Sequence, residues 1–107
     1  MFARTLELNV KIEKKPELLK KVREEILPII KKQLGYVDII ALDNEMEPTR
    51  PFVVTLWHTK TDAERYERET FPKVKQILDP FMTTAPVVKV YAVETTISQK
   101  LMETVAA

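Results

Sequence analysis

The stretch "VVTLWHTKTDAERY", residues 53–66, joins the end of an apolar segment to the start of a polar one. The preceding run "FVVTLWH" is rich in β-branched and aromatic residues and predicts a strand. Thr61 and Glu64 have the spacing of a capping box, so we expect a helix to begin near Asp62. Trp57 and His58, the single tryptophan and the single histidine of the chain, lie at the junction. This stretch predicts a strand, a short turn and a helix.

The N-terminal part of the chain has the same plan. "RTLELNVKI" alternates apolar and polar residues, which predicts a half-buried strand. Apolar residues then recur at helical spacing from Pro16, which suits a first turn, to Gly35, which suits the left-handed residue that ends a helix. Pro28 should kink or divide this helix. The alternative is a true break at Leu27, followed by a short second helix.

The remaining segments complete a six-element order. "YVDIIALD" is apolar on both faces and predicts a strand, "NEMEPTRP" predicts a hairpin loop, and "PVVKVYAVET" predicts a fourth strand. The helix after residue 61 should bend at Pro72, with an inner stripe of Ala63, Tyr66, Thr70, Val74 and Ile77 or Leu78. The order β-α-β-β-α-β predicts a ferredoxin-like α+β fold, with four antiparallel strands and two helices on one face. We expect one domain over residues 1–96 and a tail at 97–107 that can form a short helix.

Composition excludes several classes of function. The chain has 107 residues, 17 Lys and Arg, 16 Asp and Glu, and no cysteine. The absence of a basic excess argues against nucleic-acid binding, and one histidine with scattered carboxylates makes a poor metal-ligand set. No apolar run approaches the length of a membrane span, and the N-terminus lacks the pattern of a signal peptide. We therefore expect a cytoplasmic protein that binds neither membranes nor nucleic acid.

Alternation predicts which side of the sheet each strand residue faces. Three wholly apolar sets are expected under the helices: Leu6, Leu8, Val10 and Ile12; Phe52, Val54 and Leu56; Val88, Val90 and Ala92. The same alternation directs His58 toward the helices and Trp57 toward the open face, so the two are not expected to form a reactive pair. A bulge near the end of the strand would reverse this assignment.

The open face should then combine Trp57 and Tyr91 with polar residues. Such an apolar surface usually marks an interface or a ligand site, so a partner subunit is expected to cover it. The polar members Asn9, Thr55 and Lys89 would line the space that remains.

Two segments resemble a known family. "EEILPIIKKQLGYVDIIALDNE" and "VVTLWHTKTDAERY" are similar to the helix–Pro–Gly–strand and strand–turn–helix segments of the antibiotic-biosynthesis-monooxygenase family of dimeric α+β barrels. The resemblance spans about residues 3–96. It implies a homodimer whose sheets pair face to face, with a pocket between each sheet and its helices. Members include cofactor-independent oxygenases of quinol-like and anthrone-like aromatics, haem-degrading enzymes, and many proteins without known activity.

The resemblance disfavours haem degradation. Haem-degrading members place a second tryptophan at the position of Tyr66 and the iron-binding histidine at the position of Gln76. Their asparagine falls near Leu6 or Thr5, not at Asn9. Together with the missing metal ligands, the resemblance implies a protein without a cofactor. The oxygenases rely on polar residues whose positions vary, and Trp57 and Tyr66 are the nearest matches.

We therefore expect a cofactor-independent monooxygenase that acts on a small planar aromatic, with an ionisable pocket residue removing a phenolic proton. The candidate catalytic residues are Asn9, Trp57, Tyr66 and His58, and the candidate substrate-binding residues are Thr55, Lys89 and Tyr91. The competing roles are structural: His58 bonding a helix terminus, Asp62 or Glu64; Trp57 and Tyr91 packing in a dimer interface; Lys89 pairing with Glu7. Two other functions remain open, a non-catalytic ligand-binding or stress-response module and a structural dimer with a filled cavity.

Overall fold

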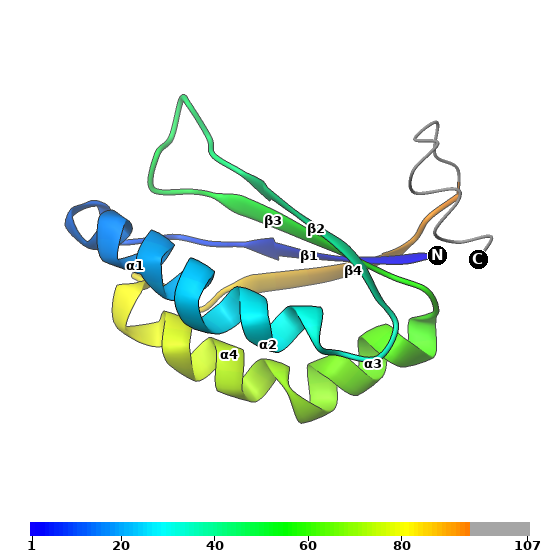
Figure 1. Ribbon diagram of the computed structural model, residues 1–107. Helices are drawn as coiled ribbons and strands as arrows, with labels where there is room; N and C mark the ends of the chain where they lie inside the picture. Colours follow the sequence, from blue (N-terminus) through cyan, green and yellow to red (C-terminus); the bar gives the residue numbers. More distant parts are fainter. Residues whose placement is uncertain (95–107) are drawn as a thin grey trace.

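A computed structural model describes residues 1–94 of the chain (Figure 1). The strands are β1 (Phe2–Glu7), β2 (Tyr36–Leu42), β3 (Phe52–Trp57) and β4 (Val87–Ala92). The α-helices are α1 (Lys15–Lys21), α2 (Leu27–Lys31), α3 (Lys60–Glu69) and α4 (Phe71–Leu78). A π-helical turn, η2 (Val22–Ile26), joins α1 to α2, and the short helices η1 (Ile12–Lys14) and η3 (Asp79–Phe81) are of the 3₁₀ type. The expected tail at residues 97–107 lies outside the described residues.

The strands form one antiparallel sheet in the order β2-β3-β1-β4. Both helical segments lie on one face of it, and the loop between β2 and β3 rises on the other side (Figure 1). The ferredoxin-like α+β architecture expected from the sequence is confirmed. Within residues 1–94, no helix is long and apolar enough to cross a bilayer.

The first helical segment is continuous from Lys15 to Lys31, with Pro16 in the first turn as expected. The helix is neither broken at Leu27 nor divided at Pro28. Because Pro28 has no N–H to donate, the turn before it widens, and the Leu27 N–H bonds the carbonyl of Val22 five residues earlier. The helix therefore accommodates Pro28 by forming a π turn before it.

Gly35 and Thr59 fix the approach of β3 to α3. Gly35 has the expected left-handed conformation, with φ +83°, and its carbonyl accepts the His58 N–H at 2.8 Å. The expected cap at Thr61 is wrong: Thr59 caps α3, because its hydroxyl accepts the Asp62 N–H at 3.1 Å and donates to the Asp62 carboxylate at 2.8 Å. The helix consequently begins at Lys60, two residues earlier than expected.

The second helical segment bends where expected. It divides at Thr70, and Pro72 lies in the first turn of α4, where its missing N–H leaves no helical bond unmade. The inner stripe is confirmed by four of its predicted members, which are almost completely buried: Ala63, Tyr66, Val74 and Leu78.

The orientation predicted for β3 is wrong. In the register between β1 and β3, Phe2 lies opposite Trp57, Arg4 opposite Thr55 and Leu6 opposite Val53. Directly opposed residues share a face, so Trp57 and Thr55 lie on the helix side together with Leu6. Trp57 is 0% exposed there. The β1–β3 register is regular, so no bulge explains the reversal. Both alternating sets of β3 residues are apolar enough to face a core: Phe52, Val54 and Leu56, and Val53, Thr55 and Trp57. Hydrophobicity alone therefore does not determine which set faces the helices.

The faces predicted for β1 and β4 hold in part. Leu6, Leu8 and Val10 are buried as expected. Ile12 is 51% exposed, because β1 ends at Glu7 and Ile12 begins a 3₁₀ turn instead of continuing the strand. The register also places Val88, Val90 and Ala92 on the helix side, yet Val90 of the edge strand β4 is 57% exposed.

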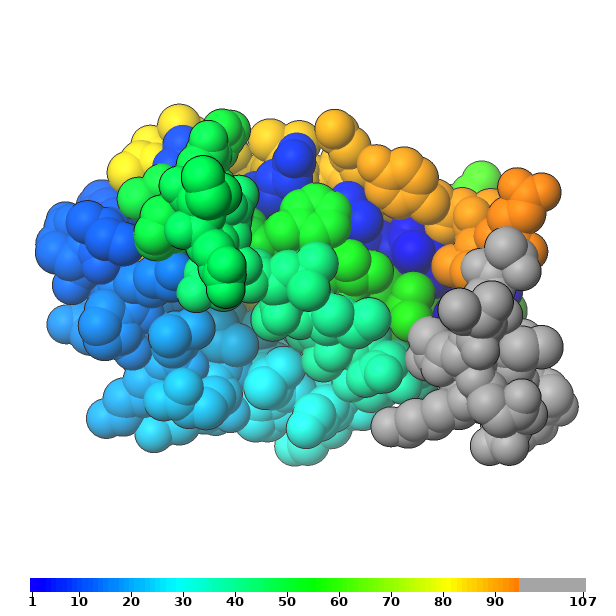
Figure 2. Space-filling view, turned by 90° about the horizontal axis from the view of Figure 1, so that it is seen from above, coloured from blue at the N-terminus to red at the C-terminus, as the bar shows by residue number. Residues whose placement is uncertain are grey.

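The open face of the sheet is seen directly in Figure 2. Its apolar members include Ile40 and Leu42 of β2 and Val87 and Tyr91 of β4, which are 41–50% exposed. Lys89 lies among them. The face is thus apolar as expected, although it contains neither Trp57 nor Thr55.

Candidate functional site

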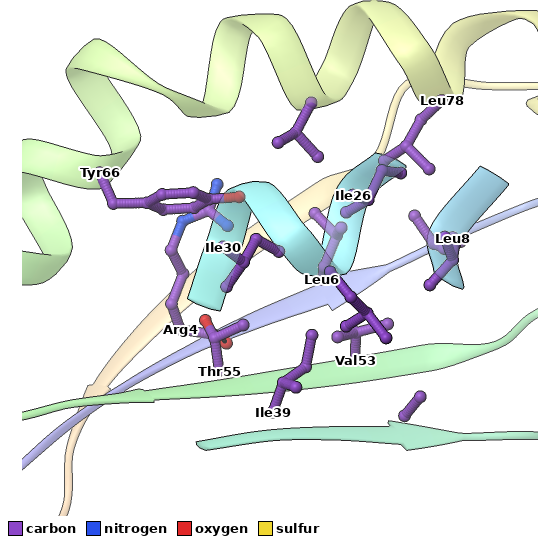
Figure 3. Close-up of a pocket in the computed structure, with 14 residues that line it drawn as sticks. Arg4, Leu6, Leu8, Ile26, Ile30, Ile39, Val53, Thr55, Tyr66 and Leu78 are labelled. Carbon is purple, nitrogen blue, oxygen red and sulfur yellow. Dashed lines mark hydrogen bonds between the residues drawn. The ribbon is translucent and has the colours of Figure 1, made fainter. Parts of the chain in front are cut away.

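A cavity of about 200 Å³ lies between the helix side of the sheet and the helices (Figure 3). Its floor comes from β1, β2 and β3, and its roof from η2 and α2 together with α3 and α4. The lining is largely apolar and consists of Arg4, Leu6, Leu8, Val22, Ile26, Leu27, Ile30, Ile39, Ala41, Val53, Thr55, Tyr66, Val74 and Leu78. The π turn contributes Val22 and Ile26, so the distortion caused by Pro28 shapes one wall.

The polar groups of this cavity gather at one end, where Arg4, Thr55 and Tyr66 meet (Figure 3). The Thr55 hydroxyl accepts the indole N–H of Trp57 at 3.0 Å and donates to the carbonyl of Arg4 at 3.2 Å. These two bonds fix the rotamer of Thr55 and hold β1 and β3 in register at this end. Trp57 does not line the cavity. It contacts two residues that do, Thr55 through a hydrogen bond and Tyr66 through ring stacking.

Tyr66 extends from α3 across the cavity, and its hydroxyl points toward the centre (Figure 3). Its ring stacks on Trp57 with centroids 4.9 Å apart and an interplanar angle of 29°. Burial raises the pKa of Tyr66 to about 12, an effect that the Arg4 charge opposes and the Glu67 charge adds to. Tyr66 is therefore a neutral phenol at neutral pH, able to donate a hydrogen bond but unable to act as a base.

Arg4 brings a positive charge to the same end of the cavity while only 3% exposed. Its Nε–H donates to the Glu67 carboxylate at 2.7 Å, and its guanidinium lies 4.0 Å from the Phe71 ring centroid and 5.1 Å from that of Tyr66. The Nη2 nitrogen contacts the same Glu67 oxygen, but only Nε meets that oxygen with hydrogen-bonding geometry. Within residues 1–94, Nη2 is buried without a hydrogen-bond partner.

Four of the predicted site residues lie away from this cavity: Asn9, Lys89, Tyr91 and His58. Asn9 lines a separate polar hollow of about 260 Å³ beyond the end of β1. Lys89 lies 3.8 Å from the Glu7 carboxylate, so the expected ion pair between them is present. Tyr91 is 50% exposed on the open face. The cavity expected between Asn9, Thr55 and Lys89 is therefore not formed, because Thr55 points to the opposite side of the sheet.

His58 follows the last residue of β3 and is exposed. It does not line the cavity. The described hydrogen bonds involve its backbone N–H and not its imidazole, so neither the catalytic role nor the expected side-chain bond to Asp62 or Glu64 is supported within residues 1–94. Burial acts to raise the pKa of the neighbouring Asp62, but the hydrogen bonds from Thr59 and Arg65, followed by the charge of Arg65 and a smaller effect of His58, lower it overall.

Arg4 is the site residue that sequence reasoning missed. The signal was present, since Arg4 occupies the same alternating set as Leu6 and Leu8, in which a charge is unexpected. Among residues 1–94, no cluster of three or more His, Cys, Asp or Glu side chains is placed to hold a metal ion. The cavity lining offers one guanidinium and two hydroxyl groups as its side-chain polar groups. These can orient an oxygen-bearing ligand in an apolar space.

No family model and no curated protein matches the sequence. Solved structures do match its fold. A Deinococcus radiodurans protein provisionally described as an antibiotic biosynthesis monooxygenase superposes with a TM-score of 0.77, at 12% identity over 92% of this chain and 97% of that one. A Nitrosomonas europaea protein with the same provisional description gives a TM-score of 0.72, at 18% identity over 89% of this chain and 100% of that one.

A variant of SnoaB from Streptomyces nogalater, described as a cofactor-independent oxygenase, also matches. Its TM-score is 0.73, at 13% identity over 92% of this chain and 97% of that one. The resemblance noted in the sequence is thus confirmed at the level of fold: the chain has the ferredoxin-like α+β fold of structures described as antibiotic biosynthesis monooxygenases.

Proposed function

We propose that the protein belongs to the antibiotic-biosynthesis-monooxygenase family and binds a small planar aromatic compound in the cavity under the sheet. The proposed reaction is a cofactor-independent oxygenation. The observation that carries the proposal is the cavity itself, an apolar space with Arg4, Thr55 and Tyr66 gathered at one end. The fold shared with SnoaB, which is described as a cofactor-independent oxygenase, supports the choice of reaction.

The size of the cavity narrows the substrate class. Its volume of about 200 Å³ exceeds the roughly 150 Å³ of a cavity that accommodates benzene. It is below the range of about 300–1,000 Å³ typical of pockets for drug-sized ligands. A ligand of one or two fused rings therefore fits better than a three-ring anthrone. We propose a quinol of naphthalene size as the representative substrate.

The chemistry balances without a reductant. Loss of a phenolic proton gives an electron-rich anion whose ring carbon attacks dioxygen, forming a C–O bond. The O–O bond then breaks as the C–H proton leaves the same carbon, and one water molecule departs. A naphthoquinol thus becomes a hydroxynaphthoquinone, with one oxygen atom in the product and one in water. All four electrons that reduce dioxygen come from the substrate.

The residues of the polar end have distinct roles in this proposal. Arg4 stabilises negative charge on the substrate oxygen, in a low-dielectric site where such stabilisation is strong. The Tyr66 hydroxyl donates a hydrogen bond, since its raised pKa keeps it protonated. Thr55 offers a fixed oxygen atom because its own proton is committed to the Arg4 carbonyl. The apolar walls exclude water, which protects a peroxide intermediate from hydrolysis.

A second candidate function is a non-catalytic module that binds the same class of ligand, with a role in a stress response as one form of it. One observation favours it: among residues 1–94, the cavity lining includes no His, Asp, Glu or Lys side chain, and its ionisable groups are Arg4 and Tyr66. An enzyme that removes a proton usually places such a group in its site. The oxygenase therefore requires a substrate acidic enough to ionise beside Arg4.

We also propose that the protein forms a homodimer through the open face of the sheet. The half-exposed side chains of Ile40, Leu42, Val87 and Tyr91 make that face unusually apolar for a surface in contact with water. Sedimentation equilibrium should report twice the mass of the chain, and the substitution Ile40→Lys should shift the equilibrium to the monomer. A monomer at high concentration would contradict the proposal.

Fluorescence of Trp57, the single tryptophan, tests the oxygenase. The protein is first titrated with naphthoquinol without oxygen, and isotopically labelled dioxygen is then admitted. Saturable quenching, followed by a hydroxynaphthoquinone carrying one labelled atom, supports the oxygenase. Saturable quenching with only the unlabelled quinone and hydrogen peroxide, at the rate of the protein-free control, supports the binding module. Absence of saturable quenching contradicts both.

A further inference from the structure

Arg4 has an unused bonding capacity at the cavity. A guanidinium carries five N–H donors, and the hydrogen bond from Nε to Glu67 uses one of them. The Nη2 nitrogen is completely buried and has no hydrogen-bond partner within residues 1–94. The burial of this charged donor is incompletely compensated, because it has lost water and its contact with the Glu67 oxygen lacks hydrogen-bonding geometry. A ligand that supplies an acceptor oxygen would relieve this cost.

The surroundings of Arg4 explain why its Nη2 nitrogen has no well-formed hydrogen bond in addition to the bond from Nε to Glu67. Its guanidinium is covered by the faces of Phe71 and Tyr66, which attract a cation but accept no strong hydrogen bond. The Glu67 side chain is 47% exposed while that of Arg4 is 3% exposed. Glu67 thus reaches Arg4 from a half-exposed position on α3, and of the two side chains only Arg4 lines the cavity.

Glu67 is also a replaceable partner. A half-exposed carboxylate that leaves Arg4 is hydrated at once, so its release costs little compared with removing a buried partner. An anionic oxygen that enters the cavity has, unlike Glu67, already lost its hydrating water. It therefore gains most from a hydrogen bond with the buried guanidinium, because charge-assisted hydrogen bonds are strongest in an apolar site.

We infer that Arg4 donates hydrogen bonds to an anionic oxygen carried by the ring of the ligand, and that Glu67 gives up some or all of its contact with Arg4 when the ligand binds. The cavity therefore selects ring acids over neutral rings of the same size. This inference rests on the cavity of the proposed function and names the feature that its ligand must carry. The shared chemistry is an aromatic oxyanion, either a phenolate or a carboxylate. Arg4 is on this account a specificity-determining residue that touches the ligand.

Three probes of equal ring size test the inference without any oxidation: naphthalene, naphthol and naphthoate. Affinities are measured by calorimetry for the unaltered chain and for Arg4→Met, Arg4→Lys and Glu67→Gln. We expect Arg4→Met to weaken naphthoate on the order of tenfold to a hundredfold, the usual effect of a hydrogen bond to a charged group, and to leave naphthalene within about twofold. Arg4→Lys should recover part of the loss, which also shows that the site still folds.

Glu67→Gln is the matched variant on the other side of the contact. It removes a negative charge that competes with the ligand for Arg4, so naphthoate should bind more tightly. If the pair of Arg4 and Glu67 were only structural, Glu67→Gln would bind naphthoate no better than the unaltered chain. The absorbance of bound naphthol separates the two sources of oxyanion. The naphtholate spectrum at neutral pH in the unaltered chain, replaced by the naphthol spectrum in Arg4→Met, assigns a phenolate site.

If the naphthol spectrum persists in the unaltered chain while naphthoate binding depends on Arg4, a carboxylate site is assigned instead.

Equal weakening of all three probes by Arg4→Met would overturn the inference, as would unchanged naphthoate binding. Binding of naphthalene alone would overturn it and leave the proposed cavity intact. Failure of all three probes to bind would overturn the cavity as well. Loss of oxygenation with these results intact would refute only the proposed reaction.

Discussion

Trp57 lies against Tyr66, with ring centroids 4.9 Å apart and planes inclined by 29°. This stacking joins the end of β3 to the middle of α3 across the core. Trp57 also donates its indole N–H to Thr55, and Thr55 in turn bonds the backbone of Arg4. The one tryptophan thus connects the core to the polar end of the cavity, and for that reason its fluorescence reports on the cavity while its side chain remains fully buried.

Trp57→Phe should destabilise the protein by about 1–3 kcal/mol, because it shortens a fully buried side chain and removes the donor from Thr55. Urea denaturation followed by circular dichroism measures this loss. His58→Ala is the control from the adjacent position, and because His58 is exposed its effect should remain within about 0.5 kcal/mol. A larger loss for His58→Ala than for Trp57→Phe would contradict the assigned orientation of β3.

Stability should fall at alkaline pH through Tyr66. Its pKa in the folded chain is raised to about 12, from the value of 10.0 for a free tyrosine. The folded state therefore holds the phenolic proton more tightly than the unfolded state. The resulting stabilisation is complete below about pH 10 and is lost as the pH rises toward about 12, at roughly 1 kcal/mol per pH unit.

Tyr66→Phe removes this titration while keeping the ring stacked on Trp57. The difference in unfolding free energy between the unaltered chain and Tyr66→Phe, measured between about pH 8 and pH 11, isolates the contribution of Tyr66. Tyr36, whose pKa is also raised, chiefly by burial, is present in both proteins and cancels. A difference that stays constant across this range would show that the Tyr66 hydroxyl is not buried as described.

Gly35→Ala should destabilise the chain by at least about 1–2 kcal/mol, the usual cost of a left-handed conformation for a residue with a Cβ atom. The backbone at Gly35 has φ +83°, and a Cβ atom there would lie 2.2 Å from the carboxyl carbon of Asp62. The clash adds to the conformational cost unless Asp62 moves and weakens its bond to Thr59. Thermal unfolding measures the sum, and an unchanged melting temperature would contradict this geometry.

The fold could be predicted from the sequence because its signals are local and agree with one another. Pro16, Gly35 and Pro72 each occupy the helix or turn position that their backbone preferences require. Amphipathic spacing identified the buried stripe from Ala63 to Leu78. The predictions that were wrong required a choice between two nearby residues with the same capacity, such as Thr59 and Thr61 as the cap of α3. Either hydroxyl can cap a helix, and the local sequence does not distinguish them; in the structure Thr59 accepts the Asp62 N–H.

The site could be predicted less well, because it depends on which face of β3 meets the helices. Val53, Thr55 and Trp57 compete with Phe52, Val54 and Leu56, and hydrophobicity favours the wrong set. The deciding interactions are the non-local stacking of Trp57 on Tyr66 and the hydrogen bonds of Thr55. Arg4 escaped notice because its charge is accommodated by Glu67, Phe71 and Tyr66, which are more than sixty positions away in the chain.

The most direct test of the account is whether ligands bind under the sheet or on its open face. Val53 lines the cavity, and its neighbour Val54 faces the other side. Val53→Phe should fill the cavity and abolish the quenching of Trp57 by naphthoquinol, whereas Val54→Phe should leave the binding constant within about twofold, as expected for a residue outside the site. Retained binding in Val53→Phe together with loss in Val54→Phe would place the ligand on the open face and contradict the account.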